Sequence, residues 1–419
     1  MNKTYLYRID WLIIICYISL VLFGAVNIYS TTYDNSMNQG FSPESLAGKH
    51  IIIFFVSFLL GFLILFIKTQ FFQQLSYVIY FVSILSLIGL FFFGETVNSA
   101  TSWYLIKGIS LQPSELAKIG TALAISRHLS DFNTDIKKTK SLLTGLILIL
   151  IPFLLIILQP DPGSAIIFGS FFLVFFREGL SFNYLFFLLI ALILFISTLL
   201  IEVKYIIILL VIFSLMIFYI LNRPSKKIKI FPYIIFILVS TTFILSVNFI
   251  FDSVFEQRHR DRFNVILGLV EDTQGLGYNV NQSKIAIGSG GLKGKGFLEG
   301  TQTKGNFVPE QQTDYIFTTV GEEWGFVGSS LLILIFVILI VRMLNQAEKQ
   351  TNIFRRNFIY SICILLFSHF TINIGMSLGL LPTIGIPLPF ISSGGSSLLS
   401  FSLLIFIYLN FDSNRLNEW

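Results

Sequence analysis

The class of fold is decided at residues 11–30, which read WLIIICYISLVLFGAVNIYS. A helix of about 20 apolar residues crosses the hydrocarbon core of a bilayer, so this run predicts a membrane span. A cleavable signal peptide has a shorter apolar core and a small-residue cleavage site. Because this run is long and is followed by TTYDNS, we interpret it as a span that is retained.

Further apolar stretches repeat the pattern along the 419-residue chain. The expected spans are 11–30, 50–68, 73–93, 112–128, 140–158, 163–177, 182–201, 203–222, 230–251, 313–341, 357–381 and 390–411. The fourth and sixth are the weakest, because the fourth contains Glu115 and Lys118 and the sixth is short. The sequence therefore predicts an all-α polytopic membrane protein of about twelve transmembrane helices.

Composition agrees with this class. Hydrophobic residues make up 54% of the chain and charged residues 12%, whereas soluble proteins carry about 25% charge. The two cysteines lie in apolar runs and the four histidines show no ligand spacing, which argues against a disulfide framework or a metal site built on them. The net charge of +5 does not indicate nucleic-acid binding, because most basic residues lie in short loops between spans.

Lysine and arginine set the predicted orientation, because cytoplasmic loops are enriched in them. With a cytoplasmic N-terminus, 17 of them fall on the cytoplasmic side and three, Lys49, Lys107 and Lys204, in short outer loops. The C-terminus then returns to the cytoplasm. The expected regions are nine spans in 1–251, a large extracytoplasmic loop in 252–312 between spans 9 and 10, and three spans in 313–419.

The outer loop is polar, glycine-rich and charged, and its apolar anchors argue against disorder. Within it, Asp272 follows Glu271 and precedes the flexible turn GLGY at 275–278. A carboxylate at a cavity mouth beside the bilayer has a raised pKa, which suits a general base. A solvated loop charge is the alternative interpretation of Asp272.

Glycines at 288–291 and 294–296, with nearby lysines, are typical of an anion cradle of backbone N–H groups. The spacing is not that of a nucleotide-binding P-loop, and the anion expected outside the membrane is a lipid phosphate or diphosphate. A solvated charged loop is the alternative. Candidate residues for the diphosphate or its sugar are Arg258, Arg262, Lys284, Ser289, Lys293, Lys295, Gln302, Glu310 and Ser396.

Glu115 and Lys118 are three residues apart, so on a helix beginning near Pro113 they share a face and can pair. A structural ion pair and a role in substrate or partner signalling both remain open. QPDPG at 159–163 predicts a rigid turn, or else a carboxylate lining a cavity. The Pro/Gly-rich stretch 378–397 could either donate to a phosphate or sugar, or cap and pack helices.

Five ordered blocks span most of the chain: LQPSELAK (111–118), QPDPGSA (159–165), DTQGLGYNVNQSKIAIGSGGLKGKGFLEGTQ (272–302), FVPEQQTDYIFTTVGEEWGFVG (307–328) and NIGMSLGLLPTIGIPLPFISSGGSSLL (373–399). Together they resemble the SEDS family (shape, elongation, division and sporulation), and GKG and GTQ favour its elongation-type branch. The chain departs from the family at Ser102, at Pro162 and Ser164, and at Ser393. The family has ten spans, and the two extra spans expected here fall between 182 and 251.

The resemblance implies a peptidoglycan glycosyltransferase that polymerises lipid II outside the cytoplasmic membrane. It maps the essential loop aspartate of the family onto Asp272, and the Glu and Lys of the fourth span onto Glu115 and Lys118. It implies a class B penicillin-binding protein of the elongation complex as partner. No cofactor is required by it, a divalent cation (Mg²⁺ or Mn²⁺) is compatible with it, and no metal ligand is assigned. A lipid II flippase, which needs no loop carboxylate, is the alternative function.

Overall fold

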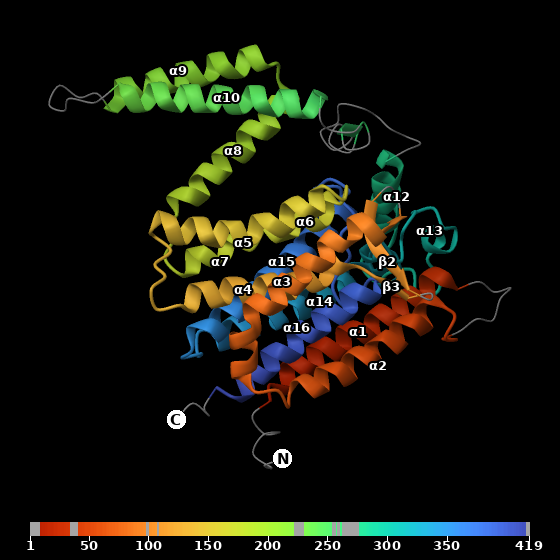
Figure 1. Ribbon diagram of the computed structural model, residues 1–419. Helices are drawn as coiled ribbons and strands as arrows, with labels where there is room; N and C mark the ends of the chain where they lie inside the picture. Colours follow the sequence, from red (N-terminus) through yellow and green to blue (C-terminus); the bar gives the residue numbers. More distant parts are fainter. Residues whose placement is uncertain are drawn as a thin grey trace. The chain divides into compact units, whose positions relative to one another are not determined.

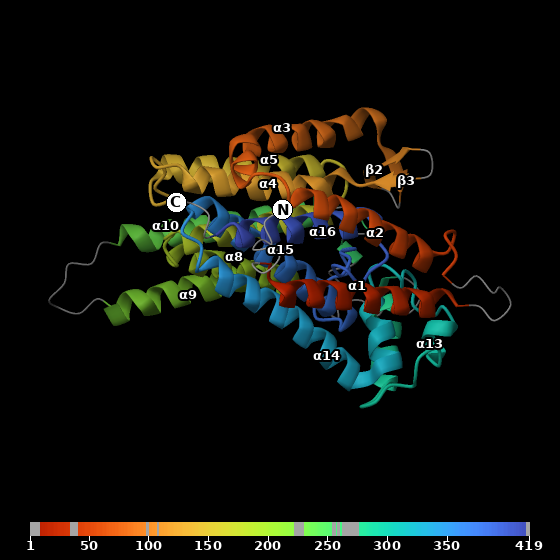
Figure 2. The same ribbon diagram turned by 90° about the horizontal axis from the view of Figure 1, so that it is seen from below.

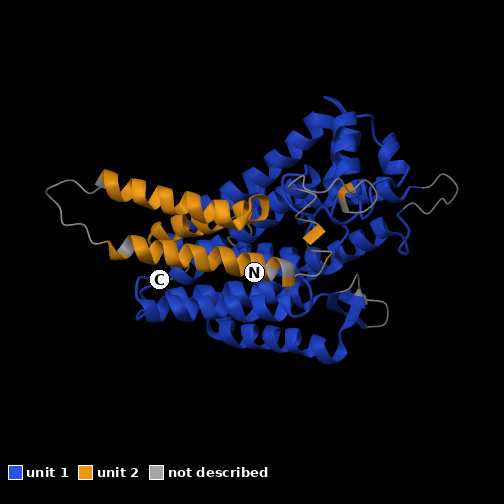
Figure 3. Cartoon of the chain, turned by 90° about the horizontal axis from the view of Figure 1, so that it is seen from above, with its two compact units in different colours: residues 1–180, 278–419 blue, residues 181–277 orange. Residues whose placement is uncertain are grey.

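The computed structural model describes residues 9–33, 41–97, 100–106, 109–221, 230–253, 257, 260, 261 and 276–415. The chain forms two compact units, which Figure 3 colours separately. Unit 1 combines residues 1–180 with 278–419, and unit 2 is residues 181–277. Unit 1 is therefore assembled from both ends of the sequence.

Unit 1 is a helical bundle with one small sheet (Figures 1 and 2). Its elements are α1 (Trp11–Thr32), α2 (Leu46–Ile64), α3 (Thr69–Phe93), β1 (Glu95–Val97), β2 (Ala100–Ile106), β3 (Ile109–Leu111), α4 (Pro113–Ser130), α5 (Thr139–Ile157), α6 (Pro162–Gly169), α7 (Phe172–Arg177), nearly all of α12 (Leu276–Ser289), α13 (Thr301–Lys304), α14 (Ile316–Ala347), α15 (Ile353–Ser377) and α16 (Gly395–Ser413).

Within the described ranges, nine helices are long and apolar enough to cross a membrane. They are α1, α2, α3, α5, α8, α9, α14, α15 and α16. The expected sixth span is divided into α6 and α7, and α10 has a shorter apolar stretch. The protein is thus a multi-pass helical membrane protein, while the exact number of spans stays a prediction.

Helix α4 is the least apolar helix at an expected span, and its position explains why. It packs against α3, α5, α15 and α16, and most of its side chains are buried. A helix surrounded by protein has no need of a lipid-compatible surface, so polar residues are tolerated in it. Pro113 occupies its first turn, as expected, where a missing N–H costs nothing.

Unit 2 contains α8 (Asn183–Leu200), α9 (Val203–Leu221) and α10 (Phe231–Ser253). Helix α10 packs against both of the others around a small core of Ile206, Leu210 and Ile244. Most of the remaining apolar side chains of α8 and α9 are exposed, as expected of helices surrounded by lipid.

No strands were expected from the sequence, yet β1, β2 and β3 form an antiparallel sheet between α3 and α4 in the chain. In Figures 1 and 2 this sheet lies at the same end of unit 1 as α13. We call this end the α13 end. The first turn of α1 and the last turn of α16 lie at the opposite end, where Arg342 donates to Asp10 at 2.7 Å and Arg415 to Gln346 at 2.9 Å.

Three features of the structure were not expected from the sequence. The loop expected at 252–312 contains helices α12 and α13 among its described residues. The last helix begins at Gly395 instead of 390, because residues 378–394 form an irregular connector without helix or strand. The two compact units also divide the chain along different lines from the three consecutive regions, which stay a prediction.

Candidate functional site

Residues 276–315 fold onto α14 and α15 at the α13 end. Ser283 of α12 shares a 2.6 Å hydrogen bond with Thr318 and donates to the Ser377 carbonyl at 2.7 Å. These bonds fix α12 to the first turn of α14 and the last turn of α15. Three of the positive-φ non-glycine residues, Leu298, Asn306 and Glu310, lie farther along the same segment. Strained backbone of this kind gathers at functional sites.

A glycine turn, residues 290–296, follows α12 and packs against a break in α14. Gly325 has φ 64° and ψ −160°, so the helix loses its regular hydrogen bonds there. The turn replaces them: Lys295 N–H donates to the Glu322 carbonyl at 3.0 Å, and Gly296 N–H to the Glu323 carbonyl at 3.0 Å. In return, Phe326 N–H donates to the Gly291 carbonyl at 2.9 Å.

This pairing corrects the expected anion cradle. The N–H groups of Gly290, Gly291 and Gly294 also donate to backbone carbonyls, so the turn presents no free row of donors. Ser289, another expected anion ligand, donates to the Ala286 carbonyl of its own helix at 2.8 Å. Glycine is needed here for close packing: a Cβ at Gly294 would lie 2.1 Å from the Glu323 carbonyl oxygen.

The anion bound by this region is the carboxylate of Glu322, which is fully buried. It accepts from the backbone N–H groups of Gln302 at 2.9 Å and Thr303 at 2.8 Å, at the start of α13. Lys295 Nζ lies 2.7 Å from the same carboxylate. Lys295 and Gln302 were both expected to bind the diphosphate or its sugar. The Lys295 ammonium and the Gln302 backbone N–H hold Glu322, and substrate binding by these residues stays a prediction.

Glu323 adds a second buried carboxylate, which accepts from the Ser30 hydroxyl of α1. Neighbouring carboxylates of α14 thus anchor the turn and α1 to the same break in the helix. The Gln302 side-chain oxygen is buried with no hydrogen-bond partner among the described residues.

Of the other expected ligands, Lys284, Lys293 and Glu310 have exposed side chains. Lys284 lies across Gly379 of the connector, so its ammonium is beside the end of α15. Within the described ranges, neither lysine forms an ion pair. Asp272, Arg258 and Arg262 lie outside the described residues.

An apolar cavity of about 360 Å³ lies beside the glycine turn. Its walls come from α12, α14 and α15 and include Ile287, Phe317, Phe326, Ile333, Ile374 and Leu378. Most of its lining side chains are apolar. Such a surface accommodates a hydrocarbon chain.

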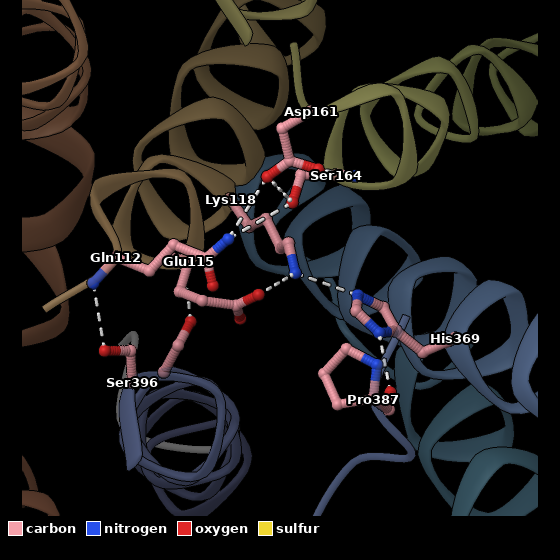
Figure 4. A network of polar contacts seen from close by, with 9 residues as sticks. Gln112, Glu115, Lys118, Asp161, Ser164, His369, Pro387 and Ser396 are labelled. Atoms are coloured by element: carbon pink, nitrogen blue, oxygen red, sulfur yellow. Dashed lines mark hydrogen bonds and ion pairs between the residues drawn. The ribbon is translucent and has the colours of Figure 1, made fainter. Parts of the chain in front are cut away.

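A buried polar network joins α4, α15 and α16 (Figure 4). The expected ion pair is present, with Lys118 Nζ 2.7 Å from Glu115 Oε1. Lys118 also lies 2.9 Å from Nε2 of His369, a contact that the sequence analysis missed. A histidine and an asparagine four residues apart in one span, His369 and Asn373, were the available signal.

A second part of the network holds the start of α4. Asp161 accepts from the Ser164 N–H at 3.0 Å and from the Gln112 amide at 3.2 Å, so it caps α6 and braces α4. Ser396 accepts from the Gln112 N–H at 3.0 Å and donates to the Ser110 carbonyl at 3.2 Å. Both side chains therefore support the local structure, and the binding role expected for Ser396 stays a prediction.

The described residues contain no group of three or more His, Cys, Asp or Glu side chains that could hold a metal ion. The carboxylate of Glu322 is already saturated with donors. The described part of the site thus offers exposed ammonium groups and an apolar cavity, a combination suited to an anionic lipid.

The chain matches the family model of the FtsW/RodA/SpoVE cell cycle proteins over residues 10–208 and 205–417. It is 32% identical over 327 residues to the peptidoglycan glycosyltransferase MrdB of Escherichia coli K12, covering 77% of this chain and 73% of the relative. It is 28% identical to the peptidoglycan glycosyltransferase RodA of Treponema pallidum, covering 97% and 98%.

Solved structures show the same fold. A chain from a study of a peptidoglycan synthase complex aligns with TM-score 0.72 and 23% identity over 98% of this chain and 99% of that chain. RodA of Thermus thermophilus aligns with TM-score 0.62 and 22% identity over 97% and 98%. The family match spans both ends of the bundle and the segment folded on α14, and the chain therefore belongs to the FtsW/RodA/SpoVE family.

Proposed function

We propose that this membrane enzyme is a peptidoglycan glycosyltransferase that polymerises lipid II into β-1,4-linked glycan during cell elongation. The observation that carries the proposal is the family match over residues 10–417, together with relatives named as enzymes of this class. The elongation role rests on the GKG and GTQ sequences of the outer segment, and the relatives include both RodA and FtsW proteins.

In the proposed reaction, Asp272 removes the proton from the 4-hydroxyl of the acceptor N-acetylglucosamine. The oxygen attacks the anomeric carbon of the donor, and the bond from that carbon to the diphosphate breaks with inversion. The leaving undecaprenyl diphosphate takes the bonding electrons, and Asp272 returns its proton to solvent. Fixed positive groups stabilise a departing diphosphate, and exposed Lys284 and Lys293 can supply them.

The apolar cavity supports a lipid-linked substrate, because it lies beside the segment that carries these lysines. Confining both substrates to the membrane favours their encounter and orientation. We place the catalytic segment outside the cytoplasmic membrane and both termini inside, as the charge distribution predicts. A class B penicillin-binding protein is the proposed partner, consistent with the fold match to a chain from a synthase complex study.

The test is polymerisation of labelled lipid II by the purified protein with its partner, read as glycan chains on a gel. Asp272→Ala should abolish the polymer, since removal of a general base costs about 10²–10⁴-fold. Ser126→Ala is the matched control, because this buried hydroxyl bonds within its own helix at 2.6 Å. Equal polymer from Asp272→Ala and wild type would remove Asp272 from the mechanism.

Two further arms complete the experiment. Loss of polymer in a chelator, restored by Mg²⁺ or Mn²⁺, would show that a divalent cation takes part. Movement of lipid II across a vesicle membrane without polymer would favour the alternative function of a flippase.

A further inference from the structure

The contacts of the buried Glu115–Lys118–His369 array favour one arrangement of protons. His369 Nδ1 lies 3.2 Å from the Pro387 carbonyl oxygen, which can only accept, so Nδ1 carries the hydrogen. In a neutral imidazole the other nitrogen, Nε2, is then an acceptor. The Lys118 ammonium donates to it and to Glu115.

Burial and the ring of Phe401 stabilise this arrangement of protons. All three side chains are buried, with exposed fractions of 2%, 1% and 1% for Glu115, Lys118 and His369. The Phe401 ring of α16 packs edge-on against His369 at 4.9 Å and lies under the Lys118 ammonium at 5.5 Å. A charged imidazole would point a second donor at the ammonium, so the neutral form is the one that fits.

The array ends at the connector, whose irregular backbone is held by hydrogen bonds from side chains. Residues 382–388 have no helix or strand structure, and Gly385 and Phe390 have φ of 76° and 69°. Asn373, one turn after His369 in α15, donates to the Ile386 carbonyl at 2.8 Å. His369 and Asn373 therefore hold consecutive carbonyls of the connector.

The connector in turn holds the start of α14. Ser393 N–H donates to the Gln312 carbonyl at 2.9 Å, and the Ser392 hydroxyl donates to the Thr313 carbonyl at 2.6 Å. Asn373 also donates to the Asp314 carbonyl at 2.8 Å. Residues 312–314 end the segment that carries the proposed site, so a shift of the connector shifts that segment.

We propose that His369 is a positioning residue: the Lys118 ammonium, paired with Glu115, and the Pro387 carbonyl together hold its Nδ1–H tautomer, and His369 in this form positions the connector and the end of segment 276–315. The effect of His369 on glycosyltransferase activity rests on the proposed function, whereas its effect on the structure of the connector does not. His369 bonds the Pro387 carbonyl of the connector, so its proposed effect acts through the connector.

Two variants separate the two nitrogens. The amide of Asn can take the place of Nδ1, so His369→Asn keeps the bond to Pro387 and loses that to Lys118. The amide of Gln can take the place of Nε2, so His369→Gln keeps the bond to Lys118 and loses that to Pro387. Ser126→Ala in α4 is the control, because its buried hydroxyl bonds only the Ala122 carbonyl of its own helix.

The first readout is hydrogen exchange of peptides covering 386–394, measured on the full-length protein. His369→Gln should raise exchange of the Ser393 N–H about tenfold, the effect of one lost hydrogen bond, while His369→Asn raises it much less. The ¹⁵N shifts of His369 in wild type should show Nδ1 protonated, and Lys118→Met should weaken this preference, because the Pro387 carbonyl is then left to support it alone. Equal exchange in Asn and Gln variants, or an Nε2–H tautomer in wild type, would overturn the proposal.

The second readout is polymerisation of lipid II, with kcat and KM measured separately. His369→Gln should lower kcat about tenfold with little change in KM, and His369→Asn should recover most of the loss. Losses that simply follow the unfolding temperature of each variant would show a merely structural role and contradict the proposal. If wild type makes no polymer, the proposed function fails, while exchange and the ¹⁵N shifts still decide the positioning of the connector.

Discussion

At the scale of single residues, the carboxylate of Glu322 shows how a motif read as a ligand site can serve the fold. An ionised side chain that is fully buried must find partners, because leaving it unpaired costs several kcal/mol. Glu322 finds them in Lys295 and in the N–H groups that begin α13. The lysine and the backbone donors that appeared available to a substrate are therefore already engaged.

We predict that Glu322→Gln destabilises the protein by about 3 kcal/mol, because it leaves Lys295 and the start of α13 without their anion. Thermal unfolding in detergent measures this loss. Glu310→Gln is the matched control, since Glu310 is exposed and its substitution should change stability by less than about 0.5 kcal/mol. Similar unfolding temperatures for both variants would show that Glu322 does not anchor the turn.

Among single residues, the sequence predicted contacts between side chains that are close together in the chain. The Glu115–Lys118 pair follows from helical spacing and is present. Its third member, His369, lies 251 residues from Lys118, so the sequence marks His369 as a polar residue within a span but does not identify Lys118 as its partner. Asp272, which the family resemblance singled out, stays a prediction, because it lies outside the described residues.

At the scale of elements, the break in α14 governs the shape of the site. Hydropathy predicts a continuous span over residues 313–341, because it carries no information about which backbone carbonyls lack a hydrogen-bond partner within the helix. Gly325 opens the helix, and the glycine turn supplies the missing partners. The apolar helices were predictable from composition, whereas this turn depends on a pairing between distant segments.

Gly294→Ala should destabilise this junction by at least about 2 kcal/mol, because a side chain there meets backbone and strains a φ of 79°. Gly288→Ala is the matched control, since a Cβ at Gly288 meets nothing within 4 Å. Hydrogen exchange over 290–303 and thermal unfolding check both variants. Faster exchange in Gly294→Ala alone is the expected result, and an equal response would contradict the pairing of the turn with α14.

A second prediction concerns the junction after α14, where Arg177 of α7 donates to Glu348 at 2.5 and 3.0 Å. These bonds, followed by one from Tyr360, lower the pKa of Glu348 to about 2 from an ordinary value of 4.5. A lowered carboxylate pKa stabilises the fold above the ordinary value, and this stabilisation is lost as pH falls from 4.5 towards 2. Exposure of both side chains limits it to about 1 kcal/mol.

The unfolding temperature of Glu348→Gln should therefore lie slightly below that of wild type by a constant amount from pH 5 to 8, with pH set by buffers, and the gap should close below about pH 4.5. About 1 M salt should narrow the gap at neutral pH. A gap that is unchanged at low pH would show that the ion pair is not its cause.

At the scale of the whole molecule, the discontinuous unit 1 was not predictable from hydropathy, which orders spans only along the chain. Its core joins α1–α7 to α14–α16, and unit 2 lies between them in the sequence with a core of its own. Two separate cores predict that each unit can lose packing without the other.

Ile244→Ala tests this independence, because Ile244 is fully buried in the small core of unit 2. The substitution removes packing contacts inside the membrane and should cost on the order of 1–2 kcal/mol. Hydrogen exchange should rise in α8–α10 and stay unchanged in α14–α16. Leu339→Ala, at a fully buried position of unit 1, should show the reverse pattern. A rise in both units from either variant would show that the chain unfolds as one cooperative body.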